Sequence, residues 1–197
     1  MGECHGDGKF VRKDGSTYTG QWQNNLNHGS GKETWPDGTI YDGVHLSGCK
    51  AGEGTFTWPD GSVYKGQFAN NELDGDGTHT WQDGRSYVGQ WKNQKMHGKG
   101  VFEYPDGRKY DGEYEADRKH GYGIFTWPDG RRHEGQWLNG KQHGHGTFTD
   151  KRGEQKIAEW AEGVRLRAGM EEGDSQATSQ ITASQAPDEG ALLLPGG

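Results

Sequence analysis

The sequence predicts an all-β fold, an elongated single-layer antiparallel sheet of stacked two-stranded hairpins, and three observations lead to it. Tyr-x-Gly segments recur every 23 residues from Tyr18 onward, without insertions. Glycine accounts for 36 of the 197 residues while only 28% are hydrophobic, too few for a conventional two-layer core. All aromatic residues except Tyr122 fall in four columns of the same register. Repetition at this period indicates a chain of small supersecondary units.

The register rests on three ladders of residues with a constant step of 23. The first holds the rings of the Tyr-x-Gly segments, which are Tyr18, Tyr41, Tyr64, Tyr87 and Tyr110, with His133 in the next position. The second holds Gly-x-Gly pairs, from Gly6 and Gly8 to Gly144 and Gly146. The third runs from Gly15 to Gly153, and an Asp precedes each of its glycines except the last, where Arg152 stands. Three ladders in one register leave little room for coincidence.

Each repeat is predicted to hold two antiparallel strands. Apolar or small residues alternate with polar ones in Tyr64–Phe68 and in Gly75–Trp81, and a period of two is typical of strands. The link Trp58–Gly61 predicts a tight hairpin turn, because proline fixes φ near −65° and glycine tolerates positive φ. The link Ala69–Asp74 is longer and polar, which predicts a looser hairpin loop.

The repeats are predicted to pair with one another into one continuous sheet. Two strands cannot bury a face alone, so we expect about thirteen or fourteen strands that support one another. Glycine weakens an isolated strand, but a row of glycines on the ring-bearing face lets large aromatic rings lie flat on the backbone. Rings over glycine are therefore the expected packing mechanism.

The sequence divides into a repeat sheet at 1–168 and a tail at 169–197. The sheet comprises about six full repeats, a partial first unit and a capping end. Trp160 keeps the register, which favours a final strand followed by a helical turn within 156–170. The tail is rich in Ser, Gln, Thr, Ala and acidic residues and is expected to be disordered. Its leucines, Leu192 to Leu194, are either a docking peptide or part of an unfolded end.

No signal peptide or apolar run of membrane-spanning length occurs, so a cytoplasmic location is expected, with cytoskeletal or membrane association as further options. Cys4 and Cys49 lie nearly two repeats apart, about 19 Å across four strands. A disulfide needs Cα atoms within about 7 Å, so an intrachain bridge is not expected.

The repeat unit resembles the MORN (membrane occupation and recognition nexus) repeat, from residue 5 to about 163. One copy of the pattern consists of Tyr87, Gly89, Trp91, His97, Gly98, Gly100, Tyr104, Asp106 and Gly107. The resemblance implies a single-layer antiparallel sheet, frequent self-association, and tethering of membranes, cytoskeleton or motor proteins. It does not imply catalysis by the repeats.

Several positions depart from that pattern. His45 stands in place of a strand aromatic residue, and the other departures are Ala51 and Asp74 for His, and Lys156 and Ala158 for Tyr and Gly. The first unit lacks its opening strand, which leaves an edge strand near Lys9 and Phe10 that can pair with another chain. A fragment boundary explains the same observation equally well.

No group of residues predicts catalysis, a cofactor or a metal. The Gly-x-Gly pairs lack the third glycine and the helix of a nucleotide-binding loop. Equivalent histidines in adjacent repeats should lie about 10 Å apart, too far to share one zinc ion. Glu113 and Glu115 are close in sequence, but no apolar wall that would raise a carboxyl pKa is evident.

The formal charge of −7 argues against a general nucleic-acid binder. The charge is distributed unevenly: residues 1–84 carry 6 Lys and Arg against 12 Asp and Glu, and residues 85–168 carry 16 against 12. A basic patch for an anionic partner is predicted at Arg108, Lys109, Arg118, Lys119, Arg131, Arg132 and Lys141. The alternative is that these side chains are only solvated.

The leading hypothesis is a non-catalytic scaffold that binds protein partners, among them cytoskeletal or motor proteins, and forms a homodimer. Partner-binding rings are predicted at Tyr64, Phe68, Trp91, Tyr114 and Trp137, unless packing within the sheet consumes them. A second hypothesis is a peripheral membrane adaptor that binds anionic phospholipids through the basic C-terminal half. A third is an accessory module separated from an enzyme.

Overall fold

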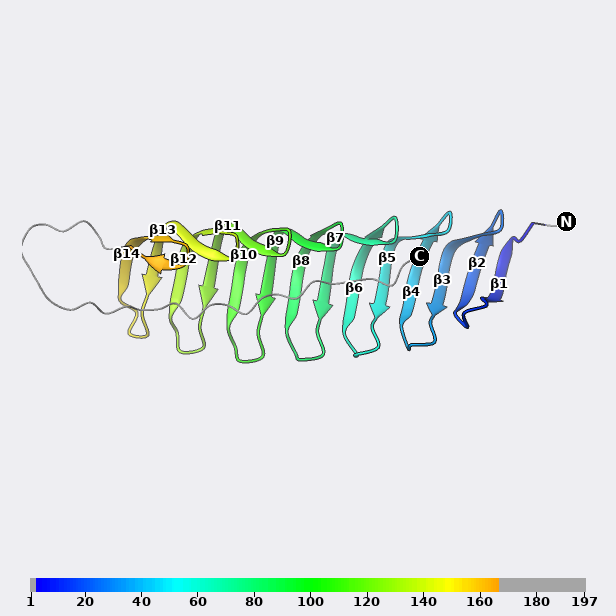
Figure 1. Cartoon of the computed structure of the whole chain (residues 1–197), viewed down its shortest axis with the longest axis horizontal. Helices are drawn as coiled ribbons and strands as arrows, with labels where there is room; N and C mark the ends of the chain where they lie inside the picture. The colour runs from blue at the N-terminus through cyan, green and yellow to red at the C-terminus, as the bar shows by residue number, and fades with distance from the viewer. Residues whose placement is uncertain (1–2, 167–197) are drawn as a thin grey trace, which may run out of the picture. The chain divides into compact units, whose positions relative to one another are not determined.

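The computed structural model describes residues 3–166, which form fifteen β-strands and no helix. The strands are hydrogen-bonded in sequence order from β1 to β15, as one open antiparallel sheet of successive hairpins (Figure 1). The all-β, single-sheet prediction is thereby confirmed. The strands are β1 Gly6–Val11, β2 Thr17–Gln23, β3 Leu26–Thr34, β4 Ile40–Leu46, β5 Cys49–Thr57, β6 Val63–Ala69, β7 Glu72–Thr80, β8 Ser86–Lys92, β9 Lys95–Glu103, β10 Lys109–Glu115, β11 Arg118–Thr126, β12 Arg132–Leu138, β13 Lys141–Thr149, β14 Gln155–Ala161 and β15 Val164–Arg165.

The chain divides into two units at the Lys95–Met96 junction. Unit 1 contains β1 to β8, and unit 2 contains β9, from Met96 onward, to β15. Within each unit, adjacent strands are joined alternately by two kinds of link at opposite edges of the sheet (Figure 1). We call the row of strand ends joined by two-residue turns the hairpin edge. The opposite row, joined by five-residue links, is the loop edge.

The tight turns lie at the links that the sequence analysis expected to be loose. Between β6 and β7 only Asn70 and Asn71 are left, with φ of 50° and 71°. Positive φ at both central residues is what a type I′ hairpin turn requires, and asparagine tolerates it well. The prediction of a longer loop at Ala69–Asp74 was therefore wrong. Asparagine is polar, as loop residues commonly are, but here its tolerance of left-handed backbone decides the turn.

The loop edge has the turn chemistry that Pro and Gly predict. The N–H of Gly61 donates to the carbonyl of Trp58 at 3.0 Å, and Gly61 has a φ of 88°. The N–H of Trp58 also donates to the carbonyl of Ser62 at 2.9 Å, which joins the first and last residues of the link.

Hairpin-edge turns are hydrogen-bonded to the preceding repeat. The N–H of Asn71 donates to the Lys50 carbonyl at 3.1 Å, and the Asn71 side-chain oxygen accepts the Lys50 N–H at 2.8 Å. Asp117 and Met96 form the same pair of bonds in unit 2, at 3.0 and 2.8 Å. Neighbouring hairpins are thus joined at the turn as well as along the strands.

Aromatic rings lie over glycine, as predicted. Tyr64 is fully buried, and its hydroxyl donates to the carbonyl of Gln67 at 3.0 Å. A Cβ atom built on Gly77 would lie 2.2 Å from that hydroxyl oxygen. Phe68 and Trp91 cover Tyr64 in edge-to-face contacts at 5.3 and 5.4 Å between ring centroids, the arrangement aromatic pairs prefer.

Both ends of the sheet differ in part from expectation. β14 places Trp160 opposite Gly144, which confirms a final strand in register. Within the described residues up to 166, the predicted helical turn is absent. Glu162 and Gly163 instead form a turn with positive φ that leads into the short strand β15. The predicted tail at 169–197, with its leucines, lies outside the described residues. β1 stands at one end of the strand order, so the edge strand near Lys9 and Phe10 is confirmed. Cys4 and Cys49 are both free thiols.

Candidate functional site

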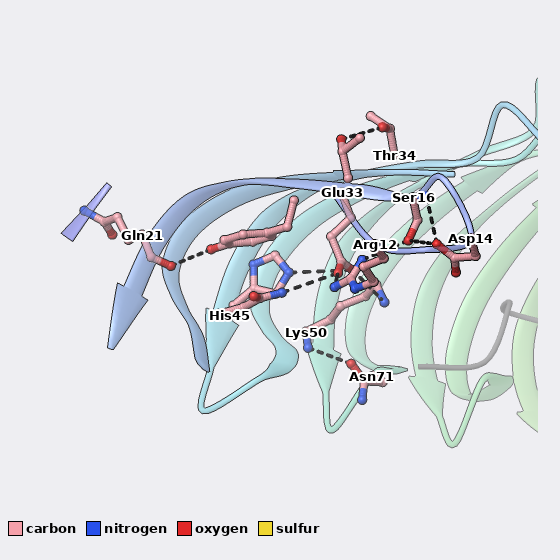
Figure 2. Close-up of polar contacts among 12 residues, drawn as sticks. Arg12, Asp14, Ser16, Gln21, Glu33, Thr34, His45, Lys50 and Asn71 are labelled. Atoms are coloured by element: carbon pink, nitrogen blue, oxygen red, sulfur yellow. Dashed lines mark hydrogen bonds and ion pairs between the residues drawn. The ribbon is translucent and has the colours of Figure 1, made fainter. Parts of the chain in front are cut away.

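A buried ionic cluster interrupts the ring-bearing face of unit 1. Glu33, on β3, occupies the repeat position that Phe56 holds one repeat later. Its carboxylate accepts a hydrogen bond from Arg12 at 2.8 Å and pairs with the Lys50 Nζ at 3.2 Å. His45 Nε2 lies 3.8 Å away (Figure 2). The Glu33, Lys50 and His45 side chains are only 7%, 5% and 1% exposed, so the Glu33–Lys50 ion pair is held within the sheet.

The electrostatics of this cluster are those of a structural ion pair. Burial alone raises the pKa of Glu33, but His45, Lys50 and Arg12 outweigh it and lower that pKa to about 2. A carboxylate with so low a pKa is a poor proton acceptor at neutral pH, and general bases work best with a pKa near the operating pH. The cluster therefore offers no good general base to a substrate.

Two buried histidines belong to the aromatic packing. His79 is stacked between Trp58 and Trp81, with centroid distances of 4.8 and 4.2 Å and nearly parallel planes. Burial lowers the pKa of His79 to about 4, and burial lowers the pKa of His133 to about 4 as well. Both imidazoles are neutral at physiological pH and act as flat rings.

The five rings predicted to bind partners are all buried in the described chain. Their exposed fractions lie between 0 and 6%, for Tyr64, Phe68, Trp91, Tyr114 and Trp137. Their polar atoms are partly used internally, since the indole N–H groups of Trp91 and Trp137 donate to the carbonyls of Gly77 and Gly123. Little ring surface is left for a partner, and the burial favours the alternative that packing consumes these rings.

The predicted basic residues do not gather on one surface. Arg108 and Arg131 lie on the loop edge, each paired with an Asp of its own loop at 2.7 and 2.8 Å. The Lys119 side chain is buried, and its Nζ donates to the Tyr104 hydroxyl at 3.3 Å. Three others are paired with carboxylates, namely Lys109 with Glu103, Arg132 with Glu134 and Lys141 with Glu162. Arg118 is exposed at the start of β11.

Partly exposed aromatic rings recur along the loop edge, at positions that are not among the predicted partner-binding rings. In unit 1 they are Trp35, Trp58 and Trp81, the first residues of three successive links. Phe10 on β1 and Trp22 on β2 are also not buried, but they lie on strands at the end of the sheet. Asp37 and Asp60, two residues after the first two tryptophans, are exposed. The signal was present in the sequence, because each of these links repeats the order Trp, any residue, Asp and Gly.

The repeat pattern matches a known family along most of the chain. The MORN repeat model matches seven segments: residues 1–17, 18–40, 50–63, 64–84, 87–107, 110–131 and 133–155. The chain belongs to the MORN repeat family. Comparison with curated proteins found no match.

Solved structures resemble this MORN repeat chain only in part. The TCP10 domain of Danio rerio CPAP, in complex with a peptide of STIL, is 20% identical over 81% of this chain and 72% of that chain, with a TM-score of 0.42. The Drosophila melanogaster SAS-4 (dCPAP) TCP domain, in complex with a proline-rich motif of Ana2 (dSTIL), is 9% identical over 77% of this chain and 88% of that chain, with a TM-score of 0.44. Both TM-scores lie below 0.5.

Two motifs of the MORN repeats remain as candidate sites, the Gly-x-Gly pairs and the acidic pair on β10. A Cβ on Gly123, in a Gly-x-Gly pair, would meet the Tyr110 ring, which gives these glycines a packing role. Glu113 and Glu115 are both exposed on β10, and Glu115 pairs with His120 at 3.4 Å. Within residues 3–166, no three His, Cys, Asp or Glu side chains come together in a way that could hold a metal ion. The same residues contain no helix capable of crossing a membrane.

Proposed function

We propose that this MORN repeat chain is a non-catalytic scaffold that binds protein partners along its loop edge. One observation carries the proposal. In unit 1 the partly exposed Trp35, Trp58 and Trp81 recur once per repeat, while the larger ring surface is buried in packing. Exposed aromatic residues are enriched in protein-binding surfaces, where they form the centre of the interface. A constant spacing of such rings suits a partner that lies along several repeats.

Photo-crosslinking at the loop edge tests this proposal directly. A benzophenone amino acid would replace Pro59, which is exposed and occupies a turn position that accepts most residues. The control places the same group at Val88, which is 53% exposed on β8. Adducts with partner proteins are expected from position 59 and not from position 88. No adducts, or the same adducts from both positions, would contradict the proposal.

Binding through the buried rings is a separate proposal, at Tyr64, Phe68, Trp91, Tyr114 and Trp137. It requires a partner to reach rings that are at most 6% exposed, so a hairpin would have to move. Partner recovery with Trp91→Ala or Trp137→Ala protein that remains folded tests it. Unchanged partner recovery would rule out binding through the buried rings.

Self-association, a homodimer and cytoskeletal or motor partners in the cytoplasm remain proposals. The observation that supports self-association is the edge strand β1, where Phe10 and Val11 are 52% and 59% exposed. An edge strand presents unpaired backbone groups to another chain. Light scattering across a concentration series tests self-association. A constant monomer mass would rule out the homodimer.

An alternative proposal is a peripheral membrane adaptor that binds anionic phospholipids. The internal ion pairs of Arg108, Lys109, Arg131, Arg132 and Lys141 weaken it, because a paired cation attracts a headgroup less. Liposome flotation with and without phosphoinositides, across salt concentrations, distinguishes this from protein binding. The other alternative is an accessory module of an enzyme, in which the repeats themselves carry no chemistry.

A further inference from the structure

Three links on the loop edge hold an arginine in the same way. In unit 1 the Arg85 Nε donates to Asp83 at 2.7 Å, and the Arg85 Cζ lies 5.3 Å from the centre of the Trp81 ring. Unit 2 repeats this arrangement twice: Arg108 pairs with Asp106 at 2.7 Å and lies 4.6 Å over Tyr104, and Arg131 pairs with Asp129 at 2.8 Å and lies 5.4 Å over Trp127. In each link the aromatic residue is first, the Asp third and the Arg fifth.

Two other links in unit 1 have the same ring and the same carboxylate without the arginine. They begin at Trp35 and Trp58, carry Asp37 and Asp60 third, and have Thr39 and Ser62 in the fifth position. The turn itself is unchanged. Asp37 accepts the N–H of Thr39 at 2.9 Å and Asp60 accepts that of Ser62 at 2.8 Å, as Asp83 accepts that of Arg85 at 3.1 Å.

The carboxylates of these two links have no cationic partner within residues 3–166. The ion pairs of unit 1 involve Glu3, Glu33 and Asp83, and neither Asp37 nor Asp60 takes part in one. Both aspartates are exposed, and Trp35 and Trp58 are partly exposed beside them. We call Trp35 with Asp37, and Trp58 with Asp60, the two Trp–Asp sites.

We propose that the two Trp–Asp sites receive two arginine side chains from an extended segment of a partner protein. This inference rests on the proposed scaffold function and deepens it by naming the chemistry of the partner. The incoming guanidinium would pair with the carboxylate and lie over the indole, as Arg85 does on Asp83 and Trp81. Lys50 Nζ already lies 5.1 Å from the Trp35 centroid and His79 is stacked on Trp58, but the filled links hold an arginine beside the same kinds of neighbour: Tyr104 carries both Lys119 and Arg108, and Trp81 carries both His79 and Arg85. Lysine fits less well, because an ammonium group has neither the planar face nor the fork of donors.

The surrounding charge and the repeat spacing both fit such a partner. Residues 1–84 carry 6 Lys and Arg against 12 Asp and Glu, so this part of the chain attracts a basic segment. The two sites are one repeat apart, and two strand spacings amount to about 9.6 Å. A segment in the polyproline II conformation turns once every three residues and rises about 9.3 Å. An Arg-x-x-Arg sequence in that conformation therefore presents two arginines on one face at nearly the spacing of the sites.

Fluorescence anisotropy with labelled peptides on the full chain tests the inference. Three peptides of equal charge and length are compared, containing Arg-x-x-Arg, Lys-x-x-Lys, or two arginines separated by five residues. The first is expected to bind about tenfold more tightly than either of the others, because only it fills both sites with stacked guanidinium groups. Equal affinities for the three peptides would overturn the inference.

A filled-site variant gives the decisive comparison. Thr39→Arg with Ser62→Arg gives both links an arginine at the fifth position, where Arg85, Arg108 and Arg131 stand in the other three. Thr39 and Ser62 are buried, so folding of the variant is checked first, and in the folded variant the preference for Arg-x-x-Arg is expected to disappear. If that variant unfolds, Asp37→Asn with Asp60→Asn removes both charges while an Asn oxygen can still cap the turn. A folded variant that binds Arg-x-x-Arg as the wild type does would overturn the inference.

Two further outcomes separate this inference from the scaffold function. Crosslinks from position 59 without any peptide preference would overturn the Trp–Asp sites and leave the scaffold in place. If the protein self-associates with rising concentration and the filled-site variant does not, the Trp–Asp sites bind a second copy of this chain. That result would overturn the proposal that the arginines come from a different protein.

Discussion

The hydroxyl oxygen of Tyr110 lies 2.3 Å from the point that a Cβ atom on Gly123 would occupy. Tyr110 is on β10 and Gly123 is on the neighbouring β11, where Gly123 pairs with Gly112. The ring takes the space of the absent side chain, and its hydroxyl donates to the carbonyl of Glu113 at 3.1 Å. Glycine and ring therefore act as one packing element.

Substitution of Gly123 by alanine is expected to destabilise the protein by about 1–3 kcal/mol or more, because the added methyl overlaps a ring with no room to move. Gly146→Ala is the matched control in the next repeat. There His133 replaces the tyrosine, and a Cβ on Gly146 would meet the ring at 2.9 Å. Urea denaturation should show a clearly larger loss for Gly123→Ala. Equal losses would contradict the ring-over-glycine mechanism.

The buried ionic cluster is expected to lose stability when one charged partner is removed, but much less when its residues are replaced together by apolar ones. Glu33→Gln leaves Lys50 buried with its strongest partner neutralised, which costs about 3–5 kcal/mol in comparable buried pairs. Replacing Glu33, His45 and Lys50 together with Phe, Phe and Leu restores the residues of the following repeat and is expected to recover most of the stability. Chemical denaturation measures both variants. A Glu33→Gln protein as stable as the wild type would show that the ion pairs contribute nothing.

Stability is expected to fall as pH decreases from about 6.5 to about 4. The folded-state pKa values of His79 and His133 are lowered from 6.5 to about 4, so the unfolded chain binds more protons in this window. Each histidine contributes stability that is complete above pH 6.5 and is lost toward pH 4, at most about 3 kcal/mol.

The pH effect has a direct control. His79→Phe with His133→Tyr restores the residues of the neighbouring repeats, and this variant is expected to lose most of the slope between pH 6.5 and 4.5. His145→Gln changes an exposed histidine and should leave the slope as in the wild type. Thermal unfolding across the pH series distinguishes these results, and an unchanged slope in the double variant would assign the effect to other groups.

The hairpin-edge turn offers a test of coupling between repeats. Asn71→Gly keeps a residue suited to positive φ but removes the oxygen that accepts the Lys50 N–H, so a loss of about 1 kcal/mol is expected. Asn70→Gly changes the neighbouring turn residue, whose φ is also positive, and should have a much smaller effect. Similar losses for the two variants would indicate that the side-chain bond to the preceding repeat is unimportant.

The repeat period and the ring-over-glycine packing could be predicted from the sequence because both follow from constant spacing. Tyr64 and Gly77 stand at the same offset as Tyr110 and Gly123, and the structure gives both pairs the same contact. The turn at Asn70 and Asn71 differs from the prediction because polarity alone does not distinguish a loop from a tight turn, whereas the left-handed backbone preference of asparagine does.

The surface was harder to predict than the fold. The sequence left open whether Trp91 binds a partner or is consumed by packing, and the structure places it against the rings of Tyr64 and Tyr87 with 3% exposure. The Glu33 cluster is visible in the sequence only when Glu33 is aligned with Phe56 one repeat later, because His45 alone does not indicate a buried ion pair. Arg108 and Arg131 were recognised as basic, yet their pairing within each loop depends on side-chain geometry that spacing does not reveal.

The bonds between hairpin turns and earlier repeats give the chain a direction. Asn71 reaches back to Lys50 and Asp117 reaches back to Met96, each to residues 21 positions closer to the N-terminus. During translation the N-terminal part leaves the ribosome first, so every new hairpin meets an anchor that has already been synthesised. The repeats can therefore be added to the growing sheet one at a time, in the order in which they are made.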